Sequence, residues 1–149
     1  MEANYFKLLE HQKKLKLEGK RLLEKDYIKL LQYEISILDH FKWEQKDRYF
    51  LLITTFLDKK IDLNEYRSRL FELEDEIQNQ LDQLKLDLEK LKEFEPNPLS
   101  KGLTKLIEYL CSDCRLCEPD PDLRDDSEIS ETELIDGLRT IFSQMQEYS

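Results

Sequence analysis

All four prolines of this 149-residue chain lie between Pro96 and Pro121, and the chain has only three glycines. Proline and glycine are the residues that most disfavour a helix interior. The lack of proline and the single glycine in the first ~95 residues therefore predict long helices there. No segment alternates with the period of two that a half-buried strand requires. We expect an all-α protein: an antiparallel helical bundle with a long helical hairpin extension and an acidic loop before the last helix.

Apolar residues recur at helical spacing in five segments. The expected helices span residues 4–24, 26–58 (with a break near 43–47), 63–94, 99–111 and 130–148, and residues 112–128 form the acidic loop. The third helix carries a heptad-like seam of Ile77, Leu81, Leu84, Leu88 and Leu91. This seam packs either against residues 8–41 of the same chain or against a helix of another chain. We expect residues 1–48 to be an N-terminal helical extension and residues 49–149 to be the bundle.

Two helix starts carry capping signals. Asp62 is placed to accept a hydrogen bond from the backbone N–H of Glu65, and Glu65 can reach back to complete a capping box. Ser130 and Glu133 repeat the same spacing farther along the chain. The pattern predicts that helices begin directly after Asp62 and at Ser130.

Negative charge is concentrated in residues 111–136. Ten carboxylates stand there against Arg115 and Arg124, which gives a net charge of −8 out of −10 for the protein. Residues 1–30 carry eight basic and five acidic side chains, or +3, so the two ends of the chain have opposite charge. An acidic chain is unsuited to direct nucleic-acid binding. Its carboxylates either serve solubility or imitate a polyanion for a basic protein partner.

Cys111, Cys114 and Cys117 have C-x-x-C-x-x-C spacing, which supplies three of the four ligands of a tetrahedral metal site. No fourth ligand of good quality lies nearby, and the only histidines, His11 and His40, are remote in sequence. The alternative is that the cysteines are small buried residues at a helix end. We expect no metal and no cofactor. An odd number of clustered cysteines also favours a reducing compartment, the cytoplasm or an organelle stroma for an organellar gene.

Residue types for catalysis are not grouped. The two histidines have no neighbouring nucleophile motif, and the three glycines are too far apart for a phosphate-binding loop. No run of ~18 apolar residues predicts a membrane span, and the first residues do not have the layout of a secretory signal. We therefore expect a protein that is not an enzyme.

Two stretches together resemble the colicin immunity-like family, of the colicin D immunity type. The first runs from Tyr49 to Leu73 and includes KIDLNEY at residues 60–66. The second runs from Lys105 to Phe142 and includes PDPDLR at residues 119–124, followed by the capped helix start. The resemblance covers less than half of the chain, and residues 1–45 and 77–94 lie outside it. It implies a small acidic four-helix bundle.

What the resemblance implies is binding. Immunity proteins of this type cover the basic active-site cleft of a tRNA-cleaving toxin domain, with carboxylates where tRNA phosphates would lie. The carboxylates that we expect to contact a basic partner here are Asp113, Glu118, Asp120, Asp122, Asp125, Asp126 and Glu128. Arg124 is expected to fold back and pair with a neighbouring carboxylate. The added helices suggest an alternative, a structural or assembly subunit of a larger complex that docks through the N-terminal helical hairpin.

Overall fold

The computed structural model describes residues 2–149. Over that range it contains helices and no strand, so the all-α prediction is confirmed. In chain order the elements are α1 (Ala3–Leu17), α2 (Glu24–Glu44), α3 (Lys46–Leu57), α4 (Leu63–Leu86), α5 (Leu88–Glu93), α6 (Ser100–Leu116), α7 (Glu131–Met145) and the 3-10 turn η1 (Gln146–Tyr148). None of the helices between residues 2 and 149 is long and apolar enough to cross a bilayer.

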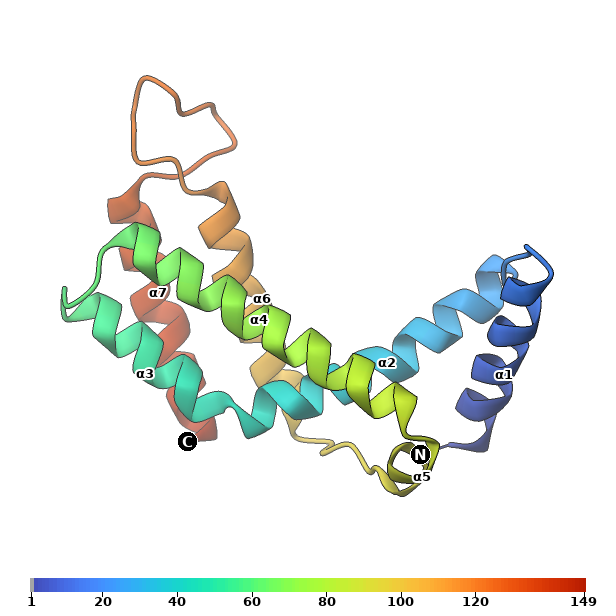
Figure 1. Cartoon of the computed structure of the whole chain (residues 1–149). Coiled ribbons are helices and arrows are strands. Elements are labelled where there is room, and N and C mark those ends of the chain that lie inside the picture. Colours follow the sequence, from blue (N-terminus) through green and yellow to red (C-terminus); the bar gives the residue numbers. More distant parts are fainter. Residues whose placement is uncertain (1) are drawn as a thin grey trace.

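The molecule has two limbs joined through α2 (Figure 1). One limb contains α3, α4, α6 and α7, and ends in the loop between α6 and α7. The other limb, which we call the arm, consists of α1, the α1–α2 turn and the first half of α2, residues 3–35. Besides α1, α2 packs against α4 and α6, so this helix belongs to both limbs.

Two apolar clusters stabilise these limbs. The larger one fills the bundle, where Tyr49, Leu70 and Ile107 are completely buried or nearly so. The smaller one joins α1 and α2 to the C-terminal end of α4 and to α5, and it consists of Tyr5, Leu8, Leu9, Leu30, Ile37, Leu81 and Leu91. Ile77 belongs to the larger cluster, whereas Leu81 and Leu91 belong to the smaller one. The apolar seam of residues 77–91 is thus covered largely within the chain.

A tyrosine hydroxyl and a lysine ammonium meet one glutamate carboxylate at two places. In the bundle, the Tyr49 hydroxyl donates to Glu74 at 2.5 Å and Lys42 Nζ lies 3.3 Å from the same carboxylate. Burial, followed by the charge of Glu74, raises the pKa of Tyr49 well above its ordinary value, so this hydroxyl remains a donor. The arm repeats the arrangement with Tyr5 (α1), Glu34 (α2) and Lys85 (α4), at 3.4 and 2.8 Å from the Glu34 carboxylate.

The local predictions for helix starts mostly agree with the structure. The Asp62 side chain accepts from the Glu65 N–H at 2.8 Å. The Glu65 carboxylate, however, accepts from the Arg69 guanidinium at 2.5 Å instead of reaching back to residue 62. The full capping box forms at the start of α7, between Ser130 and Glu133. The predicted break near residues 43–47 is confirmed, since α2 ends at Glu44 and α3 begins at Lys46.

Three predicted helix ends are wrong. The helix expected over residues 63–94 is two helices, because Asp87 adopts an extended conformation and its side chain caps α5 by accepting from Lys90 N. The first helix ends at Leu17 rather than residue 24. Gly19 there has φ of +70°, and Lys20 N donates back to Leu15 O at 2.8 Å, which is a Schellman helix end. Finally, α6 continues to Leu116, so the acidic loop begins five residues later than expected.

Candidate acidic interface

The two ends of the loop between α6 and α7, residues 117–130, are tied together. Cys117 and Ile129 form an isolated parallel bridge. Glu118 N donates to Ile129 O at 2.9 Å, and Ile129 N donates to Leu116 O at 2.8 Å. The capping box of α7 fixes the chain directly after the bridge. We call residues 117–130 the acidic loop. Because of these bonds, the loop leaves and re-enters the bundle at adjacent points, which form its base.

Aspartate side chains shape the inside of the acidic loop. Asp120 Oδ1 accepts from Asp122 N at 2.9 Å, which closes a turn at the start of the loop. Asp125 Oδ1 accepts from Ser127 N at 2.8 Å and from the Ser127 hydroxyl at 2.6 Å. The hydrogen bonds from Ser127 lower the pKa of Asp125, so this carboxylate remains charged at neutral pH. The loop has a defined conformation, because turns of this kind fix the backbone locally.

Arg124 holds the loop together, but not in the predicted way. It was expected to pair with a carboxylate. Its Nε instead donates to the Glu118 carbonyl at 2.8 Å, and its Nη2 donates to the Pro119 carbonyl at 3.1 Å. From α4, Arg67 donates to the Cys117 carbonyl and ties the loop base to the bundle. Nothing in the sequence indicated this role of Arg67. The apolar periodicity around it predicts only that it lies on a helix.

Arg124→Met should loosen the acidic loop without unfolding the bundle. The variant keeps the aliphatic part of the side chain and loses both hydrogen bonds, which are worth about 1–3 kcal/mol. We expect amide hydrogen exchange of residues 118–128 to become on the order of tenfold faster, measured by mass spectrometry. The matched control is Arg139→Met, which alters an exposed arginine on α7. Unchanged protection in Arg124→Met would show that the bridge at the base suffices to order the loop.

Within residues 2–149, the carboxylates of the acidic loop form no ion pair. Asp120, Asp122, Asp125 and Asp126 are exposed, whereas Glu118 and Glu128 are half-buried. None of the ion pairs found between residues 2 and 149 includes any of these six side chains. Six of the seven predicted partner-binding residues therefore lie together on one loop.

Asp113, the seventh predicted binding residue, is placed differently. It lies on α6, one helical turn before the loop, because this helix is longer than expected. Its side chain is half-buried against α7, close enough that a Cβ on Gly137 would lie 3.5 Å from its Oδ2. Burial raises the pKa of Asp113 above the ordinary value. Asp113 thus lies on the helix that precedes the acidic loop and not on the loop itself.

The cysteines are buried beneath the loop. Cys111, Cys114 and Cys117 are free thiols, all of them buried. Burial raises the pKa of Cys111 to about 12 and that of Cys114 to about 11, so both remain protonated. Over residues 2–149, no three His, Cys, Asp or Glu side chains are grouped to hold a metal ion. Burial at the C-terminal end of α6 agrees with the interpretation of the cysteines as small core residues.

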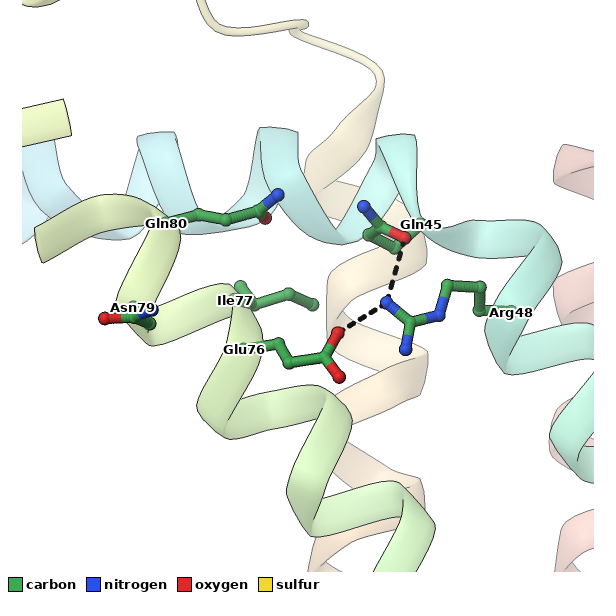
Figure 2. Close-up of a pocket in the computed structure, with 6 residues that line it drawn as sticks. All are labelled: Gln45, Arg48, Glu76, Ile77, Asn79 and Gln80. Carbon is green, nitrogen blue, oxygen red and sulfur yellow. Dashed lines mark hydrogen bonds and ion pairs between the residues drawn. The ribbon is translucent and has the colours of Figure 1, made fainter. Parts of the chain in front are cut away.

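A polar hollow between α3 and α4 differs from the acidic loop in that its carboxylate is paired. It has a volume of about 250 Å³ and is lined by Gln45, Arg48, Glu76, Ile77, Asn79 and Gln80 (Figure 2). Arg48 points toward Glu76, and the two side chains form an ion pair at 2.6 Å. The carboxylate here is already neutralised, and the lining supplies no nucleophile or general base. Charge free to meet a partner is found on the acidic loop instead.

No family model matches the chain, and neither a curated protein nor a solved structure matches it. The resemblance to the colicin immunity-like family therefore stays a prediction, which rests on the sequence of residues 49–73 and 105–142.

Proposed function

We propose that this protein is a non-catalytic binding protein whose acidic loop covers a basic nuclease or RNA-binding site on a protein partner. The main support is that six carboxylates on one ordered loop have no cation within the described chain. The resemblance to immunity proteins implies the same kind of activity. The basic partner would be a tRNA-cleaving toxin domain or a subunit of a larger complex.

The exposed carboxylates of the acidic loop favour both the rate of association with a basic partner and the affinity of the complex. A concentrated negative field accelerates the encounter with a basic surface and selects against acidic ones. Once in contact, lysine and arginine side chains of the partner can form charge-assisted hydrogen bonds with the exposed carboxylates. A loop already held by Arg124 and by its base loses little conformational entropy on binding. Leu123, with 70% of its surface exposed, adds an apolar contact at the centre of the charged segment.

One observation favours the alternative function, docking to a larger complex through the arm. On the first half of α2, Tyr27, Ile28, Leu31 and Ile35 form an exposed apolar stripe at helical spacing. Exposed apolar stripes of this kind commonly receive a partner helix. The two functions use different surfaces of the molecule, and one experiment separates them.

The experiment introduces a photoreactive amino acid at one position at a time in the cells that make the protein. The positions are Leu123 on the acidic loop, Ile35 on the arm and Leu86 at the end of α4, all of which are strongly exposed. The proposal expects a basic protein to be cross-linked from Leu123 and not from Leu86. Cross-linking of a partner from Ile35 alone would contradict it and favour docking through the arm.

Binding kinetics then test the charge argument with the captured partner. Reversing Asp120, Asp122 and Asp125 to lysine should lower the association rate constant about 100-fold at low salt. The matched control reverses Glu72, Asp75 and Glu89, which are exposed carboxylates on α4 and α5. Both variants have the same net charge, so only a location-specific effect separates them. Equal rates for the two variants, or no change in either, would contradict the proposal.

A further inference from the structure

The free end of the arm contains a hollow that no part of the described chain fills. It lies between the end of α1 and the start of α2, has a volume of about 690 Å³ and includes Leu22 and Tyr27 in its lining. Leu17 and Leu23 stand beside it with 91% and 75% of their surfaces exposed. Apolar side chains exposed together at one end of a molecule indicate an interaction site.

Basic side chains surround this hollow. Lys16, Lys20 and Arg21 line it, against one lining carboxylate, that of Glu24. Glu18 lies nearby and forms an exposed ion pair with Lys20 at 3.6 Å. The immediate surroundings keep a positive balance, in agreement with the net charge of +3 over residues 1–30. An occupant of this hollow should therefore combine negative charge with an apolar side chain.

The chain itself carries a segment with those properties. The tip of the acidic loop reads Asp120-Pro121-Asp122-Leu123, followed by Arg124 and two further aspartates. Leu123 is 70% exposed, and its neighbouring carboxylates have no cation in residues 2–149. Within one molecule the loop and the hollow cannot meet, because they lie at the free ends of different limbs (Figure 1).

We propose that the hollow at the end of the arm receives the acidic loop of a second copy of this chain. Both limbs extend toward the same side of the molecule (Figure 1). When two such molecules face each other and are related by a half-turn, the arm of each lies opposite the acidic loop of the other. One two-fold axis thus forms two identical contacts and closes the assembly as a dimer. Leu123 enters the hollow, and Lys16, Lys20 and Arg21 contact the surrounding aspartates.

This dimer goes beyond the proposed function and does not depend on it, since the purified protein alone forms it. If both proposals hold, the arm covers the acidic loop until a more strongly basic partner displaces it. The tests are distinct: a partner-binding failure leaves the dimer intact, and a monomeric protein leaves partner binding possible.

Sedimentation equilibrium of the purified full chain measures the assembly directly. At low ionic strength we expect a mass of twice 18.0 kDa. Raising the salt from about 50 mM to 500 mM should weaken the dimer at least tenfold, because salt screens charge pairs between surfaces. A monomer at every concentration up to about 100 μM, a weak-affinity limit, would overturn the proposal.

A charge exchange identifies the contact. The arm variant carries Lys16→Glu, Lys20→Glu and Arg21→Glu, and the loop variant carries Asp120→Lys, Asp122→Lys and Asp125→Lys. Each variant alone should dimerise at least 100-fold more weakly than the parent, because arm and loop then have like charge. Mixed in equal amounts, the two variants should form a heterodimer, since each arm again faces a loop of opposite charge.

The control variant carries Lys60→Glu, Lys105→Glu and Arg139→Glu. These substitutions replace exposed basic residues of the bundle and change the net charge as much as those of the arm variant do. It should dimerise as the parent does. A dimer that survives in both the arm and the loop variant would overturn the proposal, as would a mixture of the two that remains monomeric. Recovery on mixing also shows that both variants are folded.

Discussion

Replacing Glu74 by alanine is expected to lower the free energy of unfolding by about 3 kcal/mol. The Glu74 carboxylate accepts from the Tyr49 hydroxyl and pairs with Lys42, so its removal leaves two polar groups without their partner. Tyr49 is fully buried, and only 13% of the Lys42 side chain is exposed. A desolvated donor or charge that loses its partner costs more than the average hydrogen bond contributes. Urea denaturation followed by circular dichroism measures the change.

The matched control is Glu76→Ala, two residues along the same helix. Glu76 pairs with Arg48 at 2.6 Å, but half of each side chain is exposed to water. Exposed ion pairs contribute little to stability, so the urea midpoint of this variant should stay close to that of the parent. A similar loss in both variants would mean that helix propensity, and not the pairing of the half-buried carboxylate, explains the effect at Glu74.

Leu91→Ala should destabilise the contact between the arm and the rest of the molecule by about 2–4 kcal/mol. Leu91 is fully buried in the smaller apolar cluster, where α5 meets α1 and α2. Truncation leaves a cavity in this cluster, and the surrounding helices can close it only in part. Besides the change in urea midpoint, we expect faster amide exchange in α1, because this helix is held mainly by the smaller cluster.

Leu88→Ala serves as the control for this second prediction. Leu88 lies one turn earlier on α5, and 42% of its surface is exposed. Its truncation changes the same residue type in the same short helix and removes much less buried surface. The protection of α1 against amide hydrogen exchange should stay near that of the parent. If α1 exchanges equally fast in parent and Leu91→Ala, the arm is held by the polar contacts of Glu34 instead.

The sequence was most informative where structure depends on nearby residues. The scarcity of helix breakers and the apolar periodicity predicted the all-α class, and the spacing of Ser130 and Glu133 predicted a helix start confirmed by the structure. These features act over a few residues, so a single chain displays them directly. The clustering of six carboxylates on one loop was visible for the same reason.

Features that depend on tertiary contacts were missed or misplaced. Asp87 ends α4 although its neighbours favour a helix, and beyond this turn Leu91 is buried in the smaller cluster. The sequence pattern places Asp113 in the loop, because nothing local indicates that α6 continues past Cys111. The bonds of Arg67 and Arg124 to backbone carbonyls are set by chain geometry, which no residue pattern encodes.

The paired base of the acidic loop has a consequence for how this protein can change over generations. Residues 119–128 lie outside the hydrogen bonds that join Leu116, Glu118 and Ile129. Substitutions there can alter charge and shape at the tip while the helices and the apolar core keep their sequence. Selection for a new contact and selection for folding therefore act on separate residues, and a lineage can diversify the first without endangering the second.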